Sequence, residues 1–136
     1  YVNGVGRMTG TFNLNSGSLT LMENVRATNV QVNGGTFYGY NPYIYTLALN
    51  ATAALRVVGA YISTLTFNAD PDPGGSGSYL THCFLLACMA NEPRTNIPIF
   101  NCTFFDSPAN VALAPGNYSN VAVAWPSSGA NWPPIP

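Results

Sequence analysis

Few side chains in this 136-residue sequence could carry out catalysis, and the carboxylates come first. There are five of them, and Asp70 and Asp72 are the closest together. Hydrolysis of a glycosidic bond needs two carboxylates about 5–10 Å apart across the sugar. Asp70 and Asp72 each precede a proline in ADPDPGGSGS (69–78), a segment typical of a surface loop, which would hold a catalytic pair poorly. The pair also lacks the acidic spacing and distal glutamate of an EF-hand calcium site.

One histidine and three cysteines are the remaining groups that could act as nucleophile, base or metal ligand. A Ser–His–Asp or Cys–His arrangement would depend on His82, which lies in the apolar stretch HCFLLACMA (82–90). We expect a buried or rim histidine bonded to backbone. A zinc site from His82, Cys83, Cys88 and Cys102 is not favoured, because adjacent strand residues point to opposite faces. The odd number of cysteines predicts buried free thiols rather than a disulfide framework. We therefore predict no enzyme activity, no metal site and no cofactor.

Tyrosines give a stronger indication of binding. Tyr38, Tyr40, Tyr43 and Tyr45 lie within GTFYGYNPYIYT (35–46). On an exposed sheet face, tyrosine offers apolar area with a polar tip, which suits contact with a sugar or another protein. Ordinary strand packing, in which tyrosine is enriched, is the alternative. We predict these four residues as candidates for contact with a carbohydrate or a partner.

The overall composition excludes several kinds of partner. Charged residues make up 7% of the chain, against about 25% in an average soluble domain, and lysine is absent. Four scattered arginines cannot neutralise several phosphates, so we expect no nucleic-acid binding. No apolar run approaches the roughly 18 residues of a membrane helix. Weak charge with 47% hydrophobic residues predicts association with copies of itself and with other proteins.

Short strands are the elements that must position these side chains. Thirteen glycines and eleven prolines interrupt the chain too often for amphipathic helices. Alternation with a period of two predicts an all-β protein. It occurs in LTL (19–21), VQV (30–32), YIYTLAL (43–49), LRVV (55–58), LTF (65–67) and VAVAW (121–125).

Four segments can also be aligned with one another. They begin at Leu19, Val30, Leu55 and Ile97, and each opens with an apolar–x–apolar pattern. Small or polar residues follow at the fifth and sixth positions, and glycine and asparagine there would allow a tight corner. These pairs are Glu23-Asn24, Gly34-Gly35, Gly59-Ala60 and Asn101-Cys102. An apolar residue returns at the eighth position as Phe37, Ile62 and Phe104, whereas the first segment has Arg26 there and Val25 just before it.

A strand–corner–strand unit that always faces one interior predicts a short β-solenoid. We interpret the first interval, from Leu19 to Val30, as two sides of one coil, and the second, from Val30 to Leu55, as one full coil. The third interval, from Leu55 to Ile97, is interpreted as one coil with the inserted surface loop 69–78. An antiparallel β-sandwich, jelly roll or barrel is the alternative, because its strands also alternate and turn at short intervals.

The stretch IFNCTFFDS (99–107) resembles the coils of right-handed parallel β-helices of the pectin-lyase-like type, in which an asparagine occupies the tight corner. Bacteriophage tailspikes and tail fibres use the same fold, and the lysine-free composition rich in Asn, Thr, Gly and Tyr is similar to that of virion surface proteins. The resemblance covers about residues 10–107. It implies a parallel β-helix, but no charged catalytic residue of the polysaccharide-cleaving members can be assigned to a position in this chain.

We expect a solenoid-like domain over residues 1–113 and a Pro-rich C-terminal tail over 114–136 that docks on a neighbouring subunit through Trp125 and Trp132. A disordered terminus is the alternative for the tail. Since the chain begins with Tyr1 rather than methionine, we also expect a processed or truncated product.

These expectations together indicate a non-enzymatic structural or adhesive protein of the virion surface, outside the cell. It would be a tail-fibre or spike segment or a capsid decoration protein, forming a homotrimer that contacts other virion proteins and a host surface glycan. One alternative is a fragment of a polysaccharide-degrading β-helix in which Glu92 and Asp106 meet across coils. Another is an extracellular filament subunit or adhesin module that shares strands between subunits.

Overall fold

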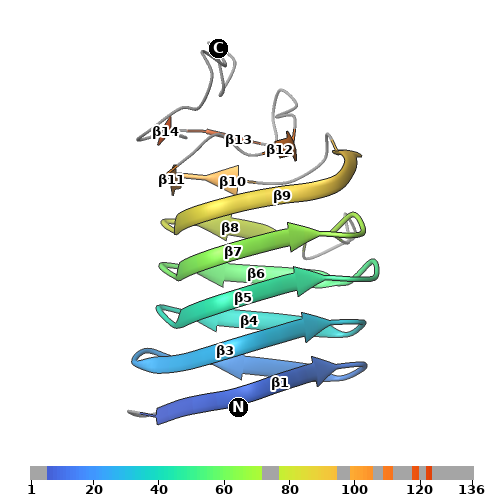
Figure 1. Ribbon diagram of the computed structural model, residues 1–136, viewed down its shortest axis with the longest axis vertical. Coiled ribbons are helices and arrows are strands. Elements are labelled where there is room, and N and C mark those ends of the chain that lie inside the picture. Colours follow the sequence, from blue (N-terminus) through green and yellow to red (C-terminus); the bar gives the residue numbers. More distant parts are fainter. Residues whose placement is uncertain are drawn as a thin grey trace.

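The computed structural model is an all-β solenoid whose chain rises through about five turns (Figure 1). It describes residues 6–71, 77–94, 99–105, 109–111, 118–119 and 122–123. All strand pairs among these residues are parallel, so the predicted solenoid is confirmed and the antiparallel sandwich or jelly roll is excluded. In Figure 1 the nearer strands run to the right and the distant strands to the left as the chain rises, which makes the coil right-handed. The described residues include no helix that could cross a membrane.

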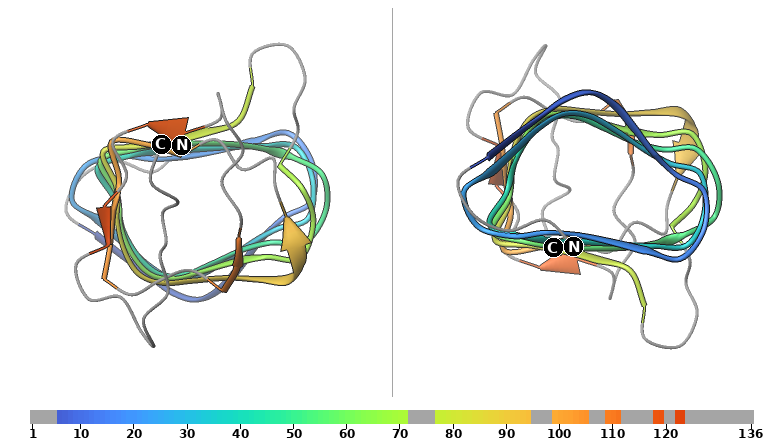
Figure 2. Two further views of the ribbon diagram at one scale, coloured as in Figure 1. Left: turned by 90° about the horizontal axis from the view of Figure 1, so that it is seen from above. Right: turned by 90° about the horizontal axis from the view of Figure 1, so that it is seen from below.

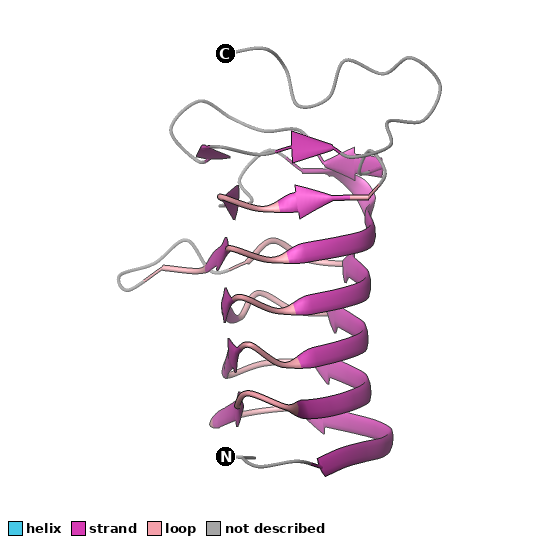
Figure 3. Ribbon diagram, turned by 90° about the vertical axis from the view of Figure 1, so that its left-hand side faces the viewer, coloured by secondary structure: helices cyan, strands magenta, loops and turns pink. Residues whose placement is uncertain are grey.

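Two parallel sheets enclose one interior. The front sheet, nearer to the viewer in Figure 1, contains β1 (Gly6–Leu14), β3 (Val25–Val32), β5 (Tyr43–Leu49), β7 (Tyr61–Phe67), β9 (Phe84–Arg94), β11 (Thr103–Phe104) and β14 (Ala122–Val123), with β12 (Ala109–Val111) paired to β9. The back sheet contains β2 (Ser18–Leu21), β4 (Thr36–Tyr40), β6 (Ala54–Val58), β8 (Tyr79–Thr81), β10 (Ile99–Phe100) and β13 (Tyr118–Ser119). Seen along the axis, the coils superpose as a flattened ring (Figure 2), and from the side they stack at an even pitch (Figure 3).

The length of a coil differs from the one that the sequence suggested. Residues in equivalent positions of neighbouring coils, such as Tyr38 and Arg56, are 18 residues apart. The coil that contains the predicted surface loop is longer, because Val57 pairs with Leu80. Leu80 in turn pairs with Ile99, so the third interval between the aligned segments covers two coils rather than one enlarged coil.

The alignment of the four segments is therefore correct in part. Leu19 and Leu55 occupy one column of the back sheet, with Phe37 between them. Val30 lies on the front sheet of the same coil as Leu19, so the first interval does represent two sides of one coil. The interpretation of the second interval, from Val30 to Leu55, as one full coil was wrong, because these two residues lie on different sheets. Ile97 lies outside the described residues.

The corners follow the predicted residue types closely. Each of the four small or polar pairs supplies one residue with a positive φ, which the chain needs in order to turn from one sheet to the other. These residues are Asn24 (φ 68), Gly35 (φ 74), Gly59 (φ 68) and Asn101 (φ 53). The apolar residues that return after three of these corners, Phe37, Ile62 and Phe104, are fully buried.

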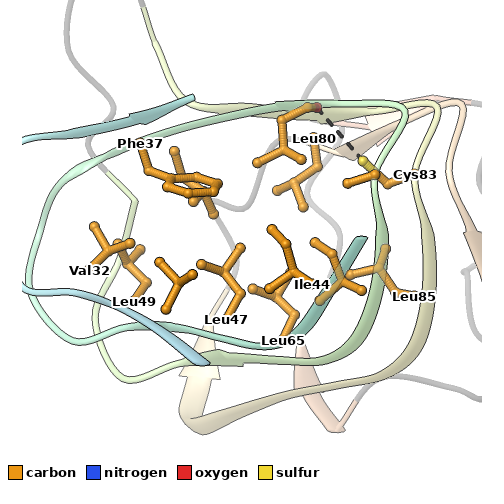
Figure 4. Packing of buried hydrophobic residues seen from close by; sticks show 14 of the residues in the cluster. Val32, Phe37, Ile44, Leu47, Leu49, Leu65, Leu80, Cys83 and Leu85 are labelled. Carbon is orange, nitrogen blue, oxygen red and sulfur yellow. Dashed lines mark hydrogen bonds between the residues drawn. The ribbon is translucent and has the colours of Figure 1, made fainter. Parts of the chain in front are cut away.

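The interior is an apolar column of branched and aromatic side chains that point inward from both sheets (Figure 4). Leu47 of β5 and Leu65 of β7 are paired residues in neighbouring coils, and both are buried. Burial of each such side chain stabilises the fold by about 1.5–3 kcal/mol. Because every coil adds another layer to the same column, the sheet surfaces outside it are held rigidly.

A row of asparagines reinforces the corner that follows the front sheet. The Asn33 side chain donates to Asn15 Oδ1 (2.9 Å), Asn50 donates to Asn33 (2.9 Å), and Asn68 donates to Asn50 (2.8 Å). Each asparagine thus donates a side-chain hydrogen bond to the asparagine of the coil below, and the row fixes the register of four coils.

Several predictions fall on parts that the structure describes only partly or not at all. Residues 72–76 of the expected surface loop, and Trp125 and Trp132 of the expected tail, lie outside the described residues. Within the tail, β13 pairs with β10 and β14 pairs with β11, so these short strands extend both sheets.

Candidate functional site

The four predicted tyrosines are divided between the two sheets. Tyr38 and Tyr40 belong to β4 of the back sheet, and Tyr43 and Tyr45 belong to β5 of the front sheet. A corner at Asn41, with a φ of 56°, separates the two pairs. The tyrosines therefore form two separate surfaces, each of which has to be considered by itself.

On the back sheet, an arginine is bound tightly into the tyrosine pair. Arg56 lies over the Tyr38 ring, with its Cζ atom 5.5 Å from the ring centroid, and Tyr38 stacks against Tyr40 at 6.4 Å. The Arg56 Nε atom donates to the carbonyl of Gly77 at 2.9 Å, and Nη1 donates to the Tyr38 hydroxyl at 3.5 Å. Because its donors are engaged and its side chain is half-buried, Arg56 holds the segment before β8 against the sheet.

On the front sheet, two arginines continue into a ladder of aromatic rings along the solenoid axis. The row consists of paired residues from successive coils: Arg7, Arg26, Tyr43, Tyr61 and Phe84. The Arg26 Cζ atom lies 5.4 Å from the Tyr43 ring centroid. The rings of Tyr43 and Tyr61 stack at 4.5 Å, and those of Tyr61 and Phe84 stack at 5.3 Å. The aromatic faces are thus used in stacking, while their edges line the surface.

Two hollows border this row and share Arg26 and Tyr43. The first has a volume of about 320 Å³ and is lined by Arg7, Arg26, Ala27, Thr28, Tyr43 and Tyr45. The second has a similar volume and is lined by Asn24, Arg26, Asn41, Pro42, Tyr43, Gly59 and Tyr61. Each is of the size that small ligands occupy. Neither guanidinium of Arg7 or Arg26 forms a hydrogen bond or ion pair within the part of the chain that the structure describes.

Tyr45 differs from the other tyrosines in its exposure. Its side chain is 62% exposed, compared with 42% for Tyr43 and 37% for Tyr40. Unlike Tyr43, it stacks on no other ring among the described residues. Tyr45 therefore lines the first hollow with a ring on which no other described ring is stacked, whereas the Tyr43 ring stacks on Tyr61 and has Arg26 over it.

The Tyr61 phenol of the ladder stays neutral at physiological pH. Burial, followed by the nearby Tyr43 hydroxyl, raises the pKa of Tyr61 above its ordinary value. A protonated phenol can both donate and accept a hydrogen bond, which suits the hydroxyl groups of a carbohydrate.

His82 and the three cysteines all lie among the described residues. His82 is exposed and its Nδ1 lies 2.8 Å from the Thr81 hydroxyl, so the predicted bond from its side chain to backbone is replaced by one to a side chain. All three cysteines are free and buried, as predicted. Burial raises the pKa of Cys88 to about 12, so this thiol stays protonated. The described residues contain no group of three or more potential metal ligands.

Cys83 and Cys102 act as small core residues at a corner. The Cys83 thiol donates to the Thr81 carbonyl at 3.3 Å, and the Cys102 thiol donates to the Phe100 carbonyl at 3.4 Å. The hydrogen bond with Cys102, followed by burial, raises the pKa of Cys83. The same hydrogen bond lowers the pKa of Cys102. Each of the two thiols also satisfies a corner carbonyl.

One carboxylate of each pair that was considered for hydrolysis lies outside the described residues. Asp70 is exposed just after β7, and Glu92 is exposed near the end of β9. Asp72 and Asp106 lie outside the described residues, so neither predicted pair can be placed.

Sequence reasoning missed Arg7, Arg26 and Tyr61, because it used an incorrect coil length. The asparagines at positions 15, 33, 50 and 68 recur at nearly the correct interval, and aligning the coils on them would have placed Arg26 and Tyr61 in one row with Tyr43. Arg7 would still have been missed, because a register irregularity in β1 shifts it by one residue.

Comparison with protein-family models, with curated proteins and with solved structures gave no match for this chain.

Proposed function

We propose that this chain is a non-enzymatic structural and adhesive β-solenoid that binds a surface glycan through the outer face of its front sheet. The observation that carries the proposal is the hollow that the exposed, unstacked Tyr45 lines together with Tyr43 and two arginines that have no hydrogen-bonding partners among the described residues. Aromatic rings with nearby hydroxyl and guanidinium donors are suited to sugars, which offer an apolar ring face and many polar groups.

The rigid coil supports an adhesive role. The lining residues of the hollow come from β1, β3 and β5, which are joined by parallel backbone pairing over one continuous core. A ligand would therefore meet an already ordered surface, which limits the entropy lost on binding.

We also propose that the protein works as a homotrimer on a virion surface, as a fibre, spike or capsid decoration component in contact with other virion proteins. Exposed apolar side chains of the last coils, Leu86, Met89 and Phe105, support contact with a neighbouring subunit. Three copies would multiply weak glycan contacts through effective concentration. Light scattering distinguishes this trimer from a monomer.

Substitution of Tyr45 tests the glycan-binding face. Tyr45→Ala should weaken the binding of oligosaccharides by about two- to tenfold, because an aromatic contact contributes about 0.5–1.5 kcal/mol. Tyr40→Ala removes an exposed tyrosine from the back sheet and serves as the matched control. Isothermal titration calorimetry with a panel of oligosaccharides measures the affinities of both variants.

An equal loss in the Tyr40→Ala variant would contradict the assignment to the front sheet. Release of reducing ends from any polysaccharide in the panel would contradict the non-enzymatic role.

A further inference from the structure

Two arginines stand side by side on the outer face of the front sheet without a counter-charge among the described residues. Arg7 and Arg26 are paired residues of β1 and β3, and neighbouring strands lie about 4.8 Å apart. Like charges opposite one another on neighbouring strands destabilise a sheet. Within the described part of the chain, neither guanidinium has a hydrogen bond or an ion pair. The repulsion is therefore uncompensated there, and an anion bound beside both arginines would relieve it.

The same hollow places an aromatic surface next to these charges. Tyr45 lines it with an exposed ring on which no other described ring is stacked, and the Arg26 guanidinium lies over the Tyr43 ring. A ligand that fits both features has an anionic group attached to a ring with an apolar face. Guanidinium groups donate two parallel N–H bonds to a carboxylate or a sulfate, which favours such a group over a neutral hydroxyl.

We infer that the hollow formed by Arg7, Arg26, Tyr43 and Tyr45 recognises an acidic glycan, with a carboxylate or sulfate of the sugar at the two arginines and the sugar ring on Tyr45. This inference rests on the proposed glycan-binding function and specifies its ligand. The chain as a whole carries a net charge of −1, so it produces no broad positive field for a long phosphate polymer. The recognition is local, by one pair of arginines and one ring.

Three oligosaccharides of equal length separate the effect of charge from that of the sugar. They are an oligogalacturonate, which carries carboxylates, a neutral galactan oligomer, and a sulfated galactan oligomer, each titrated into the full chain. We expect one or both acidic oligomers to bind at least about tenfold more tightly than the neutral one, since hydrogen bonds to charged groups are the stronger ones. The two acidic arms identify the anionic group. Raising the salt concentration should reduce the preference.

Arginine variants link this preference to the site. Arg26→Gln or Arg7→Gln should remove most of the tenfold difference in affinity between the acidic oligomers and the neutral one. Arg56→Gln, on the back sheet, is the matched control and should keep the preference. In the free protein, Arg7→Gln should raise the unfolding temperature by about 1 °C because the repulsion with Arg26 is removed.

The outcomes separate the two proposals. If the neutral oligomer binds as tightly as the acidic ones, charge recognition is wrong while glycan binding stands. If no oligomer binds, or if Tyr45→Ala has no effect on binding, the proposed function fails and the inference fails with it. If a single-stranded oligonucleotide binds more tightly than the oligogalacturonate, the ligand class is wrong.

Discussion

Each sheet of the solenoid carries one arginine on one tyrosine ring, and the two pairs have nearly the same geometry. The guanidinium carbon lies 5.5 Å from the Tyr38 centroid for Arg56 and 5.4 Å from the Tyr43 centroid for Arg26. Their surroundings differ. Arg56 is half-buried and donates to the Gly77 carbonyl at 2.9 Å, whereas Arg26 is exposed, has no hydrogen bond among the described residues and borders two hollows.

The contact of Arg56 is structural, whereas Arg26 is available to a ligand. A cation–π contact leaves the N–H donors of arginine free, so it does not by itself define a role. The role is decided by whether those donors find acceptors within the fold. In the back sheet they bind the segment that leads into β8, and in the front sheet they remain directed to solvent.

The largest effect on stability should come from the corner at Gly59, which leads from the back sheet to the front sheet. Gly59, with a φ of 68°, connects β6, which carries Arg56, to β7, which carries Tyr61. A Cβ atom there would meet the Asn41 side chain of the coil below. Gly59→Ala should lower the free energy of unfolding by about 2 kcal/mol or more, measured by urea denaturation.

Gly17→Ala provides the matched control, because Gly17 has a similar φ of 74° and open space around the added Cβ. Equal losses in the two variants would show that the contact with Asn41 does not hold the corner.

The next largest effect is the difference in stability between variants of the two arginines. Arg56→Gln should lower the free energy of unfolding by about 1–2 kcal/mol, because it removes a charged hydrogen bond to the Gly77 carbonyl. Arg26→Gln should change it by less than about 0.5 kcal/mol, as expected for an exposed side chain. Thermal unfolding of both variants checks this, and equal destabilisation would contradict the distinction between the two pairs.

The smallest effect is the part that Tyr61 of the front ladder contributes to the alkaline pH dependence of stability, beside the part that the buried Cys83 and Cys88 thiols give to every variant. The pKa of Tyr61 is raised in the folded protein by burial and by Tyr43. The stability that depends on its protonated form is complete below the unfolded value of about 10 and is lost as the pH rises through the folded value. The urea midpoint of the wild type should therefore fall more between about pH 9 and 11 than that of Tyr61→Phe. If the urea midpoints of the wild type and Tyr61→Phe fell in parallel with pH, this prediction would be contradicted. Tyr40→Phe, which changes a tyrosine outside the ladder, should behave like the wild type.

Much of the fold could be predicted from local sequence. Asn24, Gly35, Gly59 and Asn101 marked the corners correctly, because a positive φ favours glycine and asparagine whatever surrounds them. Alternation identified the buried side chains, since successive strand residues point to opposite faces. The odd number of cysteines and their apolar neighbours gave the buried free thiols.

The candidate site could be predicted only in part. Tyr43 and Tyr45 were identified because they are close in sequence and share a strand. Tyr38 and Tyr40 were grouped with them, although the corner at Asn41 turns them onto the other sheet. Arg7 and Arg26 were not identified, because nothing in their local sequence indicates that they become neighbours.

The sequence by itself determined the parallel coil, its corners and its apolar interior, because these depend on the conformational preference and hydrophobicity of single residues. The tertiary structure alone decided which outward side chains stand in one row. That depends on the register between coils, and the register is set by the exact number of residues per coil, which backbone pairing and the asparagine row fix together.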